Sequence, residues 1–485
     1  MTLPLARLFS PLALAAALAA CTVGPDYQRP AVTLPDHYKE AAAAPLPGGD
    51  WKPAEPADAA LRGEWWRLFG DPELDALQQQ ARQANQNLQA AAARLAQARA
   101  ALKTDQSARQ PRVDAGLGPS RQRPSPVSQG LPDHADTQAA TQWRAQVGIA
   151  YEADLFGRVA RQIDAGQAGA EQSAALYQSV LLALHADVAA TYFQVREYDA
   201  EAVIYRQTVA LREQTLALIE RRYDAGDIGR LDLARARTEL AQARAEAVGV
   251  ARQRALAEHA LALLLGQPAS SFSLPARPLD ALTVSIPSGL PSALLERRPD
   301  IAAAERGMAA ANARIGVAQA AFFPRLELTG ALGSEASTLD NLLHWSSRTF
   351  LLGPLVGTAL SLPLWDGGHR RADVERARAQ YEEEVAAYRQ TVLTALREVE
   401  DNLAQLRLLT RQREAQQTAL DNADQAARLS HVQYREGAIS YLDVIEADRS
   451  TLTQRRAALR LNGEQARATV LLVRALGGGW ELPTP

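Results

Sequence analysis

The chain has 485 residues, of which 47% are hydrophobic, 22% charged and 6% aromatic. Its formal net charge of −3 is no electrostatic footprint for nucleic acid. The single cysteine excludes an intrachain disulfide and a multi-cysteine metal site. Beyond residue 20, no apolar run is long enough for a membrane-spanning helix. Composition therefore excludes a nucleic-acid-binding protein and a bundle of transmembrane helices.

The N-terminus has the pattern of a lipoprotein signal. In residues 1–20, Arg7 precedes an apolar stretch rich in Ala and Leu, which predicts a secretory signal peptide. The only cysteine, Cys21, directly follows Leu-Ala-Ala, and this tetrapeptide resembles the bacterial lipobox. We expect Cys21 to carry a diacylglycerol group and an N-acyl chain, which anchor a chain without spanning the bilayer. The alternative is a chance free thiol behind an ordinary signal. Thr22 follows instead of the aspartate associated with inner-membrane retention, which favours the outer membrane.

Two long segments, 133–267 and 364–482, contain none of the 26 prolines, so long helices can run there. Apolar residues recur in both segments every three or four positions, the spacing of a coiled coil. Six apolar positions of the first segment match six of the second, and five of the six pairs are separated by 211 residues. The first set is Tyr177, Leu181, Leu184, Val188, Tyr192 and Val195, and the second is Tyr388, Val392, Leu396, Val399, Leu403 and Leu406. The sequence therefore predicts a tandem duplication.

The duplication extends to the helix ends. Gly226 and Gly437 lie in matching segments, 222–228 and 433–439, and glycine is the usual residue just past a helix C-terminus. Each long helix would measure roughly 100 Å at 1.5 Å per residue, which indicates an elongated structure. We predict long helices at about 159–224 and 370–435, and shorter helices at 230–265 and 441–476.

A different pattern precedes each long helix. Between Trp143 and Leu155, apolar and polar residues alternate, as in a strand with one apolar face. Strands of this length match those of a tilted membrane barrel. Four strands cannot close such a barrel, and open edges are not tolerated in lipid, so the chain should oligomerise. The strands are predicted at about 111–120 and 142–156 in the first repeat, and at about 324–334 and 350–365 in the second.

With these elements in place, the chain resembles the TolC-type outer-membrane efflux factor family, in the lipoprotein branch typified by OprM and NodT. The resemblance covers residues 1 to about 480. It rests on motifs that are individually weak and together strong: Cys21 with Gly24-Pro25-Asp26-Tyr27 and Pro30, the segment from Trp65 to Leu74, Arg298-Pro299-Asp300-Ile301, Ala321-Phe322-Phe323-Pro324, and the two Tyr-x-x-Gly turns.

The resemblance implies a mostly α fold with a transmembrane β portion. It implies a homotrimer whose chains each give four strands to one 12-stranded barrel, above a long periplasmic cylinder of helices. The implied function is a passive exit duct in the Gram-negative outer membrane for drugs or other small molecules. Its implied partners are a periplasmic adaptor, an inner-membrane pump, usually of the RND class, and outer-membrane lipid.

The predicted organisation of the chain follows from these elements and the resemblance. It comprises a signal peptide at 1–20, a Pro-rich arm at 21–64, a first repeat at 65–267, a linker at 268–290, a second repeat at 291–480 and a tail at 481–485.

The tip turns carry the candidate gate. Asp443 and Glu446 share one helix face because they are three residues apart. By position, the resemblance implies that they form acidic constriction rings, with Leu442 as an apolar neighbour and Asp232 as the acid of the first repeat. The alternative is that these acids only stabilise their helices, because an acidic residue in a first helical turn interacts favourably with the helix dipole by about 0.3–1 kcal/mol. The resemblance further implies a tip latch and adaptor-docking surface formed by Arg222, Tyr223, Gly226, Tyr434 and Gly437.

No enzyme signature occurs in the sequence. It contains no Gly-rich phosphate loop, no Gly-x-Ser-x-Gly elbow and no His-Glu-x-x-His pair. We therefore expect no catalytic residue, no metal site and no cofactor other than the covalent lipid. Two rivals stay open: a lipid-anchored structural coiled coil without a channel, and an outer-membrane duct for type I protein secretion. The alternating strand pairs argue against the first, and nothing in the sequence excludes the second.

Overall fold

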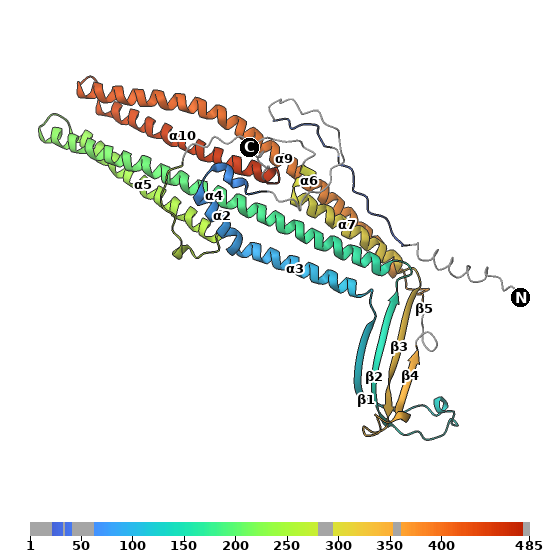
Figure 1. The fold of residues 1–485 in the computed structure, drawn as a ribbon. Coiled ribbons are helices and arrows are strands. Elements are labelled where there is room, and N and C mark those ends of the chain that lie inside the picture. The colour runs from blue at the N-terminus through green and yellow to red at the C-terminus, as the bar shows by residue number, and fades with distance from the viewer. Residues whose placement is uncertain (1–21, 33, 41–62, 280–293, 353–359, 479–485) are drawn as a thin grey trace. The chain divides into compact units, whose positions relative to one another are not determined.

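The computed structural model describes residues 22–32, 34–40, 63–279, 294–352 and 360–478. The predicted signal peptide, Cys21, most of the arm after residue 40, parts of the linker and of the last predicted strand, and the tail lie outside the described residues. The chain divides into two compact units (Figure 1). The strand unit comprises Met1–Ala31, Leu95–Ser173 and Ala304–Tyr388, and the helical unit comprises Val32–Arg94, Ala174–Ala303 and Arg389–Pro485.

The strand unit is built on one antiparallel sheet with the order β1-β2-β3-β4, in which β5 also pairs with β3 (Figure 1). The strands are β1 (Arg112–Gln122), β2 (Ala140–Ala153), β3 (Arg325–Ala336), β4 (Arg348–Leu352) and β5 (Leu360–Ser361). The first and second repeats thus contribute to a continuous sheet through the pairing of β2 with β3.

The register places apolar residues on one face of this sheet. Ala115 lies opposite Val147, and Val147 lies opposite Leu332, so the alternating pattern lines up across three strands. These apolar side chains are not covered: Leu117, for example, is 69% exposed. The opposite face carries small and polar residues, among them Arg144, which pairs with Glu335 at 3.2 Å. One face is therefore suited to lipid and the other to water.

Two strands end earlier than their alternating patterns predict. The strand predicted to reach residue 156 ends at Ala153, because the Asp154 carboxylate accepts the N–H groups of Val159 at 3.0 Å and Ala160 at 2.7 Å. Asp154 thereby caps the next helix. The strand predicted to reach residue 365 ends at Ser361, just before Pro363, which has no N–H for a ladder.

The helices form two hairpins of equal size, α4 with α5 and α9 with α10. The long helices α4 (Arg158–Asp224) and α9 (His369–Arg435) have 67 residues each, and the shorter α5 (Arg230–Leu264) and α10 (Tyr441–Ala475) have 35 each. The first and last residues of α4 and α5 recur as those of α9 and α10 at an offset of 211, the offset seen in the sequence. The remaining helices are α2 (Pro72–Ala84), α3 (Gln86–Ser107), α6 (Leu294–Arg297) and α7 (Pro299–Ala320). Within the described residues, no helix is both long and apolar enough to cross a membrane.

The apolar seam follows the helical repeat over part of its predicted length, and five of the predicted positions are half-buried: Tyr177, Leu181, Leu396, Leu403 and Leu406. Val188, Tyr192 and Val195 are buried as their spacing predicts. In the second repeat, however, Ala395 is fully buried, whereas Leu396 is half-buried. Ala395 is the position offset by 211 from Leu184, so helical phase and not side-chain size decides which residue faces the seam.

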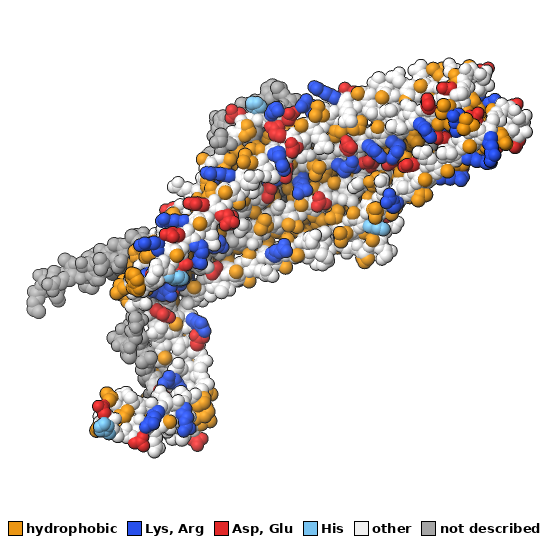
Figure 2. Space-filling model, turned by 180° about the vertical axis from the view of Figure 1, so that it is seen from behind, with side chains coloured by type: hydrophobic (Ala, Val, Ile, Leu, Met, Phe, Trp, Pro, Cys, Tyr) orange, Lys and Arg blue, Asp and Glu red, His pale blue; other side chains and the backbone are white. Residues whose placement is uncertain are grey.

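The seam of α4 also contains a buried charge. Arg196 is 1% exposed, and its guanidinium donates to Asp199 at 2.9 Å, to the Pro275 carbonyl at 2.6 Å and to Glu73. It also lies 4.8 Å from the centroid of the Tyr192 ring. These contacts connect α4 to α2 and to the segment after α5. On the face drawn in Figure 2, acidic and basic side chains are interspersed along the helices.

Removing this buried cation should destabilise the helical unit. Arg196→Met leaves the carboxylates of Glu73 and Asp199 without their shared partner, so we expect a loss of about 3–5 kcal/mol. Arg196→Lys should rescue only part of it, because an ammonium cannot reproduce the planar fork. Thermal loss of helical circular dichroism in detergent measures the effect.

A matched control is Arg237→Met, which removes a 61% exposed arginine side chain from its pair with Glu220. An exposed pair contributes at most about 1 kcal/mol. If both methionine variants melted alike, the buried network around Arg196 would not be what stabilises the unit.

Candidate functional site

Both hairpins turn at a glycine in the left-handed region. Gly226 has a φ of 79° and Gly437 a φ of 73°. The turns are closed in the same way, by hydrogen bonds from Asp227 N to the Arg222 carbonyl at 2.9 Å and from Ala438 N to the Gln433 carbonyl at 2.8 Å. Because L side chains rarely adopt this conformation, glycine allows each long helix to stop within one residue.

Next to the turns, Arg222 and Tyr434 connect the two repeats. The Arg222 guanidinium lies 5.3 Å from the centroid of the Tyr434 ring, a cation–π contact between α4 and α9. The Tyr434 ring in turn lies 5.7 Å from that of Tyr441. Burial raises the pKa of Tyr434, so its hydroxyl stays neutral. Tyr223, by contrast, is exposed, so the two predicted tip tyrosines have different surroundings.

An apolar cluster lies beneath this contact and joins the same two hairpins. Its buried members are Ile219, Leu233, Ala236, Tyr441, Val444 and Ile445, and Tyr434 and Ile439 pack against them. The tips are therefore held together by burial of apolar area as well as by the cation–π contact.

The acidic candidates differ in their surroundings. Asp443 forms a capping box at the start of α10, where its carboxylate accepts from the Ser440 N–H at 2.9 Å and from the Ser440 hydroxyl at 2.7 Å. The hydrogen bond from the Ser440 hydroxyl lowers the pKa of Asp443, so this carboxylate stays ionised. Glu446 is exposed, as is Leu442. Asp232 is half-buried and pairs with Arg235 at 3.4 Å. Asp443 thus caps its helix whether or not it also lines a pore.

A larger group of charges lies deeper between the hairpins and was not predicted from the sequence. This charge cluster consists of Arg212 on α4, Glu239 on α5, His431 on α9, and Asp448 and Arg449 on α10. Arg212 donates to Asp448 at 2.8 Å and lies 3.6 Å from Glu239, while His431 Nε2 lies 2.8 Å from Asp448. Arg449 also pairs with Glu239. The side chains of Arg212, Glu239 and Asp448 are all less than 10% exposed.

One sequence signal points to this cluster. Tyr205, Arg212 and Ile219 are spaced by seven residues and are all buried, so Arg212 stands at an apolar seam position. Asp448 likewise follows the buried Tyr441 by seven residues. A charged residue at a seam position needs a buried partner of opposite charge. A search for apolar residues alone does not detect such positions.

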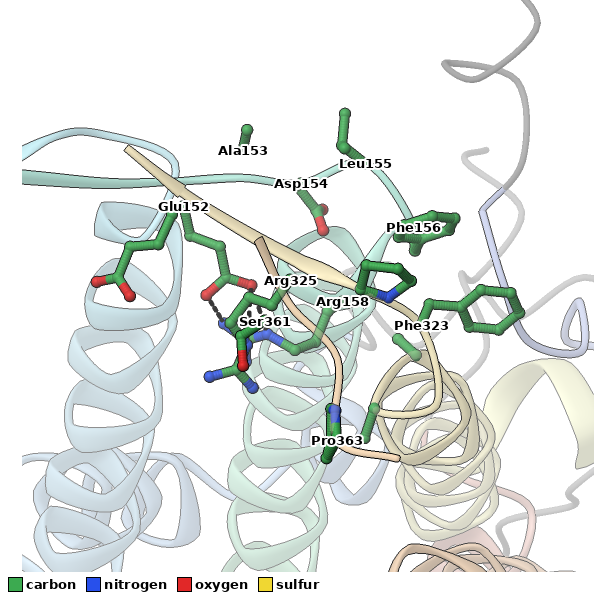
Figure 3. Close-up of a pocket in the computed structure, with 14 residues that line it drawn as sticks. Glu152, Ala153, Asp154, Leu155, Phe156, Arg158, Phe323, Arg325, Ser361 and Pro363 are labelled. Carbon is green, nitrogen blue, oxygen red and sulfur yellow. Dashed lines mark hydrogen bonds and ion pairs between the residues drawn. The ribbon is translucent and has the colours of Figure 1, made fainter. Parts of the chain in front are cut away.

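At the other end of the long helices, a pocket of about 300 Å³ lies where β2, β3, β5, α4 and α7 meet (Figure 3). Arg158 forms two hydrogen bonds to Glu152, at 2.8 and 2.7 Å, and so is neutralised there. The rings of Phe156 and Phe323 stack with their centroids 4.9 Å apart (Figure 3). The pocket therefore combines a satisfied ion pair with an aromatic wall.

The first described residues of the chain attach beside this pocket. Val23 N donates to the Phe156 carbonyl at 3.2 Å, and the Asn312 side chain donates to the Pro25 carbonyl at 2.9 Å. Gly24 passes so close to α7 that a Cβ there would lie 2.5 Å from the Gly316 Cα. Residues 22–25 are thus fixed at the level where the strands end and the helices begin.

Among the remaining histidines, the contacts of His185 and the position of His369 are accounted for by the fold. His185 is buried, its Nδ1 lies 2.6 Å from the Gln78 side-chain oxygen, and burial lowers its pKa to about 4. His369 begins α9 after a turn in which Gly367 and Gly368 have positive φ. No group of three or more potential metal ligands occurs in the described part of the chain.

Known proteins match this chain along nearly its whole length. A family model described as "Outer membrane efflux protein" matches residues 77–267 and 290–478, which are the two repeats. OprJ, an outer membrane protein of Pseudomonas aeruginosa, is 35% identical over 479 residues, covering 97% of this chain and 96% of its own. TtgF of Pseudomonas putida, named as a toluene efflux pump outer membrane protein, is 33% identical over 471 residues, covering 97% of this chain and 96% of its own.

A solved structure of the outer-membrane channel OprN superposes with a TM-score of 0.83 at 31% identity, covering 95% of this chain and 100% of its own. This agreement confirms the predicted TolC-like fold with two repeats. The matched repeats, the two-faced sheet and the paired hairpins lead to one assignment: the chain belongs to the outer membrane efflux protein family and is an efflux channel of the outer membrane.

Proposed function

We propose that three copies of the chain form one passive exit duct, which works with a periplasmic adaptor and an inner-membrane pump of the RND class. The cargo we infer is drugs or other small molecules, because TtgF is named for the efflux of toluene and another relative, OpmQ, for the export of pyoverdine. The mostly polar and small residues of the inner sheet face suit a water-filled passage, through which cargo diffuses after a pump has delivered it.

The observation that carries this proposal is the open, two-faced sheet. An exposed apolar face is stable against lipid, but unpaired strand edges are not, because lipid offers no hydrogen-bonding partner. Within the described residues, β1 pairs only with β2. The free edge of β1 must therefore pair with another chain. Three chains give the twelve strands that the resemblance implies if β4 and β5, which both pair with β3, count as the one strand predicted at about 350–365.

The first prediction concerns this assembly. Purified protein in detergent should have three times the mass of one chain once detergent and lipid are subtracted, and should open stable conducting pores in planar bilayers. Light scattering combined with refractive index and absorbance measures the protein mass. A monodisperse, folded monomer that inserts into membranes would contradict both the shared barrel and the duct.

We further propose that Cys21 carries the lipid anchor. The hydrogen bond from Val23 N to the Phe156 carbonyl supports this, because it fixes the neighbouring residues at the strand ends. Exposed apolar side chains gather in the same turns, where aromatic residues favour the membrane–water interface: Leu155, Phe322, Phe323, Leu364 and Trp365. Acyl chains on Cys21 would therefore enter the membrane at this level without straining the arm.

Replacing the proposed lipid acceptor gives the next prediction. Cys21→Ser should abolish labelling by a radioactive or clickable fatty acid and slow signal cleavage. Because barrel strands hold the protein in the membrane, we expect reduced yield and not complete loss of export. Ser10→Ala, which alters the predicted signal peptide but keeps the thiol, is the control. Mass spectrometry that finds native, unmodified Cys21 at the mature N-terminus would rule the anchor out.

The tip turns are our proposed gate and adaptor-docking surface. Exposed Tyr223, Gly226 and Gly437 are available to a partner, while the contact of Arg222 with Tyr434 closes the hairpins on each other. In a trimer, Asp443 and Glu446 would place six carboxylates around the tip, with Leu442 beside them and with Asp232 held by Arg235. Such rings attract cations and repel anions.

The gate is tested by removing charge without removing the helix cap. In Asp443→Asn/Glu446→Gln, the amide oxygen introduced at position 443 can still accept from Ser440, so α10 should start unchanged. Cation selectivity should fall, and the concentration of a trivalent cation that blocks single channels should rise by about tenfold or more, equivalent to about 1.4 kcal/mol of binding.

The matched control is Glu414→Gln/Asp421→Asn, which removes two exposed carboxylates from α9 away from the tip. It should leave selectivity and block unchanged. Unchanged block in the Asp443/Glu446 variant would remove these residues from the gate and leave Asp443 as a helix cap only.

A further inference from the structure

Asp448 is shared between the two hairpins. Its Oδ2 accepts from Arg212 of α4 at 2.8 Å, and its Oδ1 lies 2.8 Å from His431 Nε2 of α9. Since Asp448 itself belongs to α10, one bond holds it to the other hairpin and one holds it to its own. The carboxylate side chain is only 8% exposed, so neither bond is readily replaced by water.

The equivalent position in the first hairpin has different chemistry. Subtracting 211 from His431 and Asp448 gives Glu220 and Arg237, which form an ion pair at 3.1 Å between α4 and α5. Both hairpins therefore have a polar contact between their two helices at this equivalent position. In the first hairpin the partners are a glutamate and an arginine, whereas in the second hairpin one partner is a histidine, the side chain type whose ordinary pKa lies nearest neutrality.

The charge cluster is balanced only while His431 is neutral. Arg212 and Arg449 then supply two positive charges against the two carboxylates of Glu239 and Asp448. A proton on His431 adds one positive charge at a half-buried site that already holds the Arg212 guanidinium. Repulsion between these two cations opposes protonation of His431, and it is relieved if Arg212 moves away.

The other charges that face His431 do not remove this imbalance. On its own helix these are Asp424, Arg428 and Arg435, and on α10 they are Asp448 and Arg455. Asp424 is paired with Arg455 at 2.8 Å, so it is already neutralised. A surface pocket of about 340 Å³ beside His431, whose side chain is 35% exposed, gives protons access.

We propose that the charge cluster is a proton-operated clasp between the hairpins. When His431 is neutral, Asp448 binds Arg212 and holds α10 to α4; when His431 is protonated, its charge strengthens its own bond to Asp448 and repels Arg212, so the attachment of α10 to α4 weakens and the tips separate more readily. This rests on the proposed function, because it assumes that separation of the hairpins opens the duct at the proposed gate.

The sign of the pH effect follows from linkage. The hydrogen bond that His431 donates to Asp448 raises the pKa of His431 above its ordinary value, while burial and the charges of Arg212 and Arg435 oppose that rise. When Arg212 moves away, its opposing effect is lost, so the pKa of His431 is higher in the separated state than in the closed state. The separated state binds the proton more tightly, and falling pH therefore favours opening.

Single-channel recording of the full chain tests the clasp between about pH 8 and about pH 5, the range in which histidines titrate. The ratio of open to closed time should rise by about tenfold or more in the wild type as the pH falls. His431→Gln cannot be protonated and should stay mostly closed at every pH. His431→Arg carries a permanent charge and should stay mostly open at every pH.

Two controls separate the clasp from general effects of charge. Glu220→Gln removes the equivalent contact in the first hairpin, and His259→Gln removes an exposed histidine of α5; both should respond to pH as the wild type does. Asp443 does not contribute to the pH response in this range, because its lowered pKa keeps its carboxylate ionised.

The clasp is wrong if His431→Gln keeps the response of the wild type, or if His431→Arg behaves as His431→Gln does. A failure of the proposed duct looks different, since the wild type and all variants would then form no pores. A purely structural cluster is also recognisable, because both His431 variants would lower thermal stability and leave the pH response in place.

Discussion

A sheet with one exposed apolar face, whose strand β1 has only one pairing partner among the described residues, is the constraint on which the rest of the structure depends. Lipid accepts the apolar face formed by residues such as Leu117 and Val147, but it offers nothing to unpaired backbone groups. The proposed trimer meets this constraint, because strands of neighbouring chains can pair with each other and leave no edge in the lipid.

In the helical hairpins, a second constraint fixes the register in which the long helices pack. An apolar seam alone allows slippage by one heptad, because each step buries a similar set of residues. Buried charges remove this freedom. Arg196 has partners on α2 and on the segment after α5, and Arg212 has partners on α5 and α10. A shift of either helix would leave several buried charges unpaired, at a cost that no apolar contact recovers.

Much of the fold was predictable because its signals are periodic. The duplication at an offset of 211, the glycine turns and the helix bounds to within one residue or so all follow from spacing. The errors have local causes: Asp154 leaves the strand to cap α4, Pro363 ends the ladder, and helical phase selects Ala395 over Leu396. The charge cluster was missed because its members are far apart in sequence and come from four helices. Only the charged residues at seam positions, Arg212 and Asp448, hint at it.

Duplication explains why the two hairpins have equal helices, and divergence explains why their buried polar contacts differ. At the offset of 211, Arg212 corresponds to Ala423, Glu239 to Ser450, His431 to Glu220 and Asp448 to Arg237. None of these four positions keeps its residue, although the helices have kept their lengths. In the proposed clasp, the single histidine of the cluster makes the attachment of the second hairpin depend on pH, while the first hairpin keeps an ion pair of a glutamate and an arginine at the equivalent position.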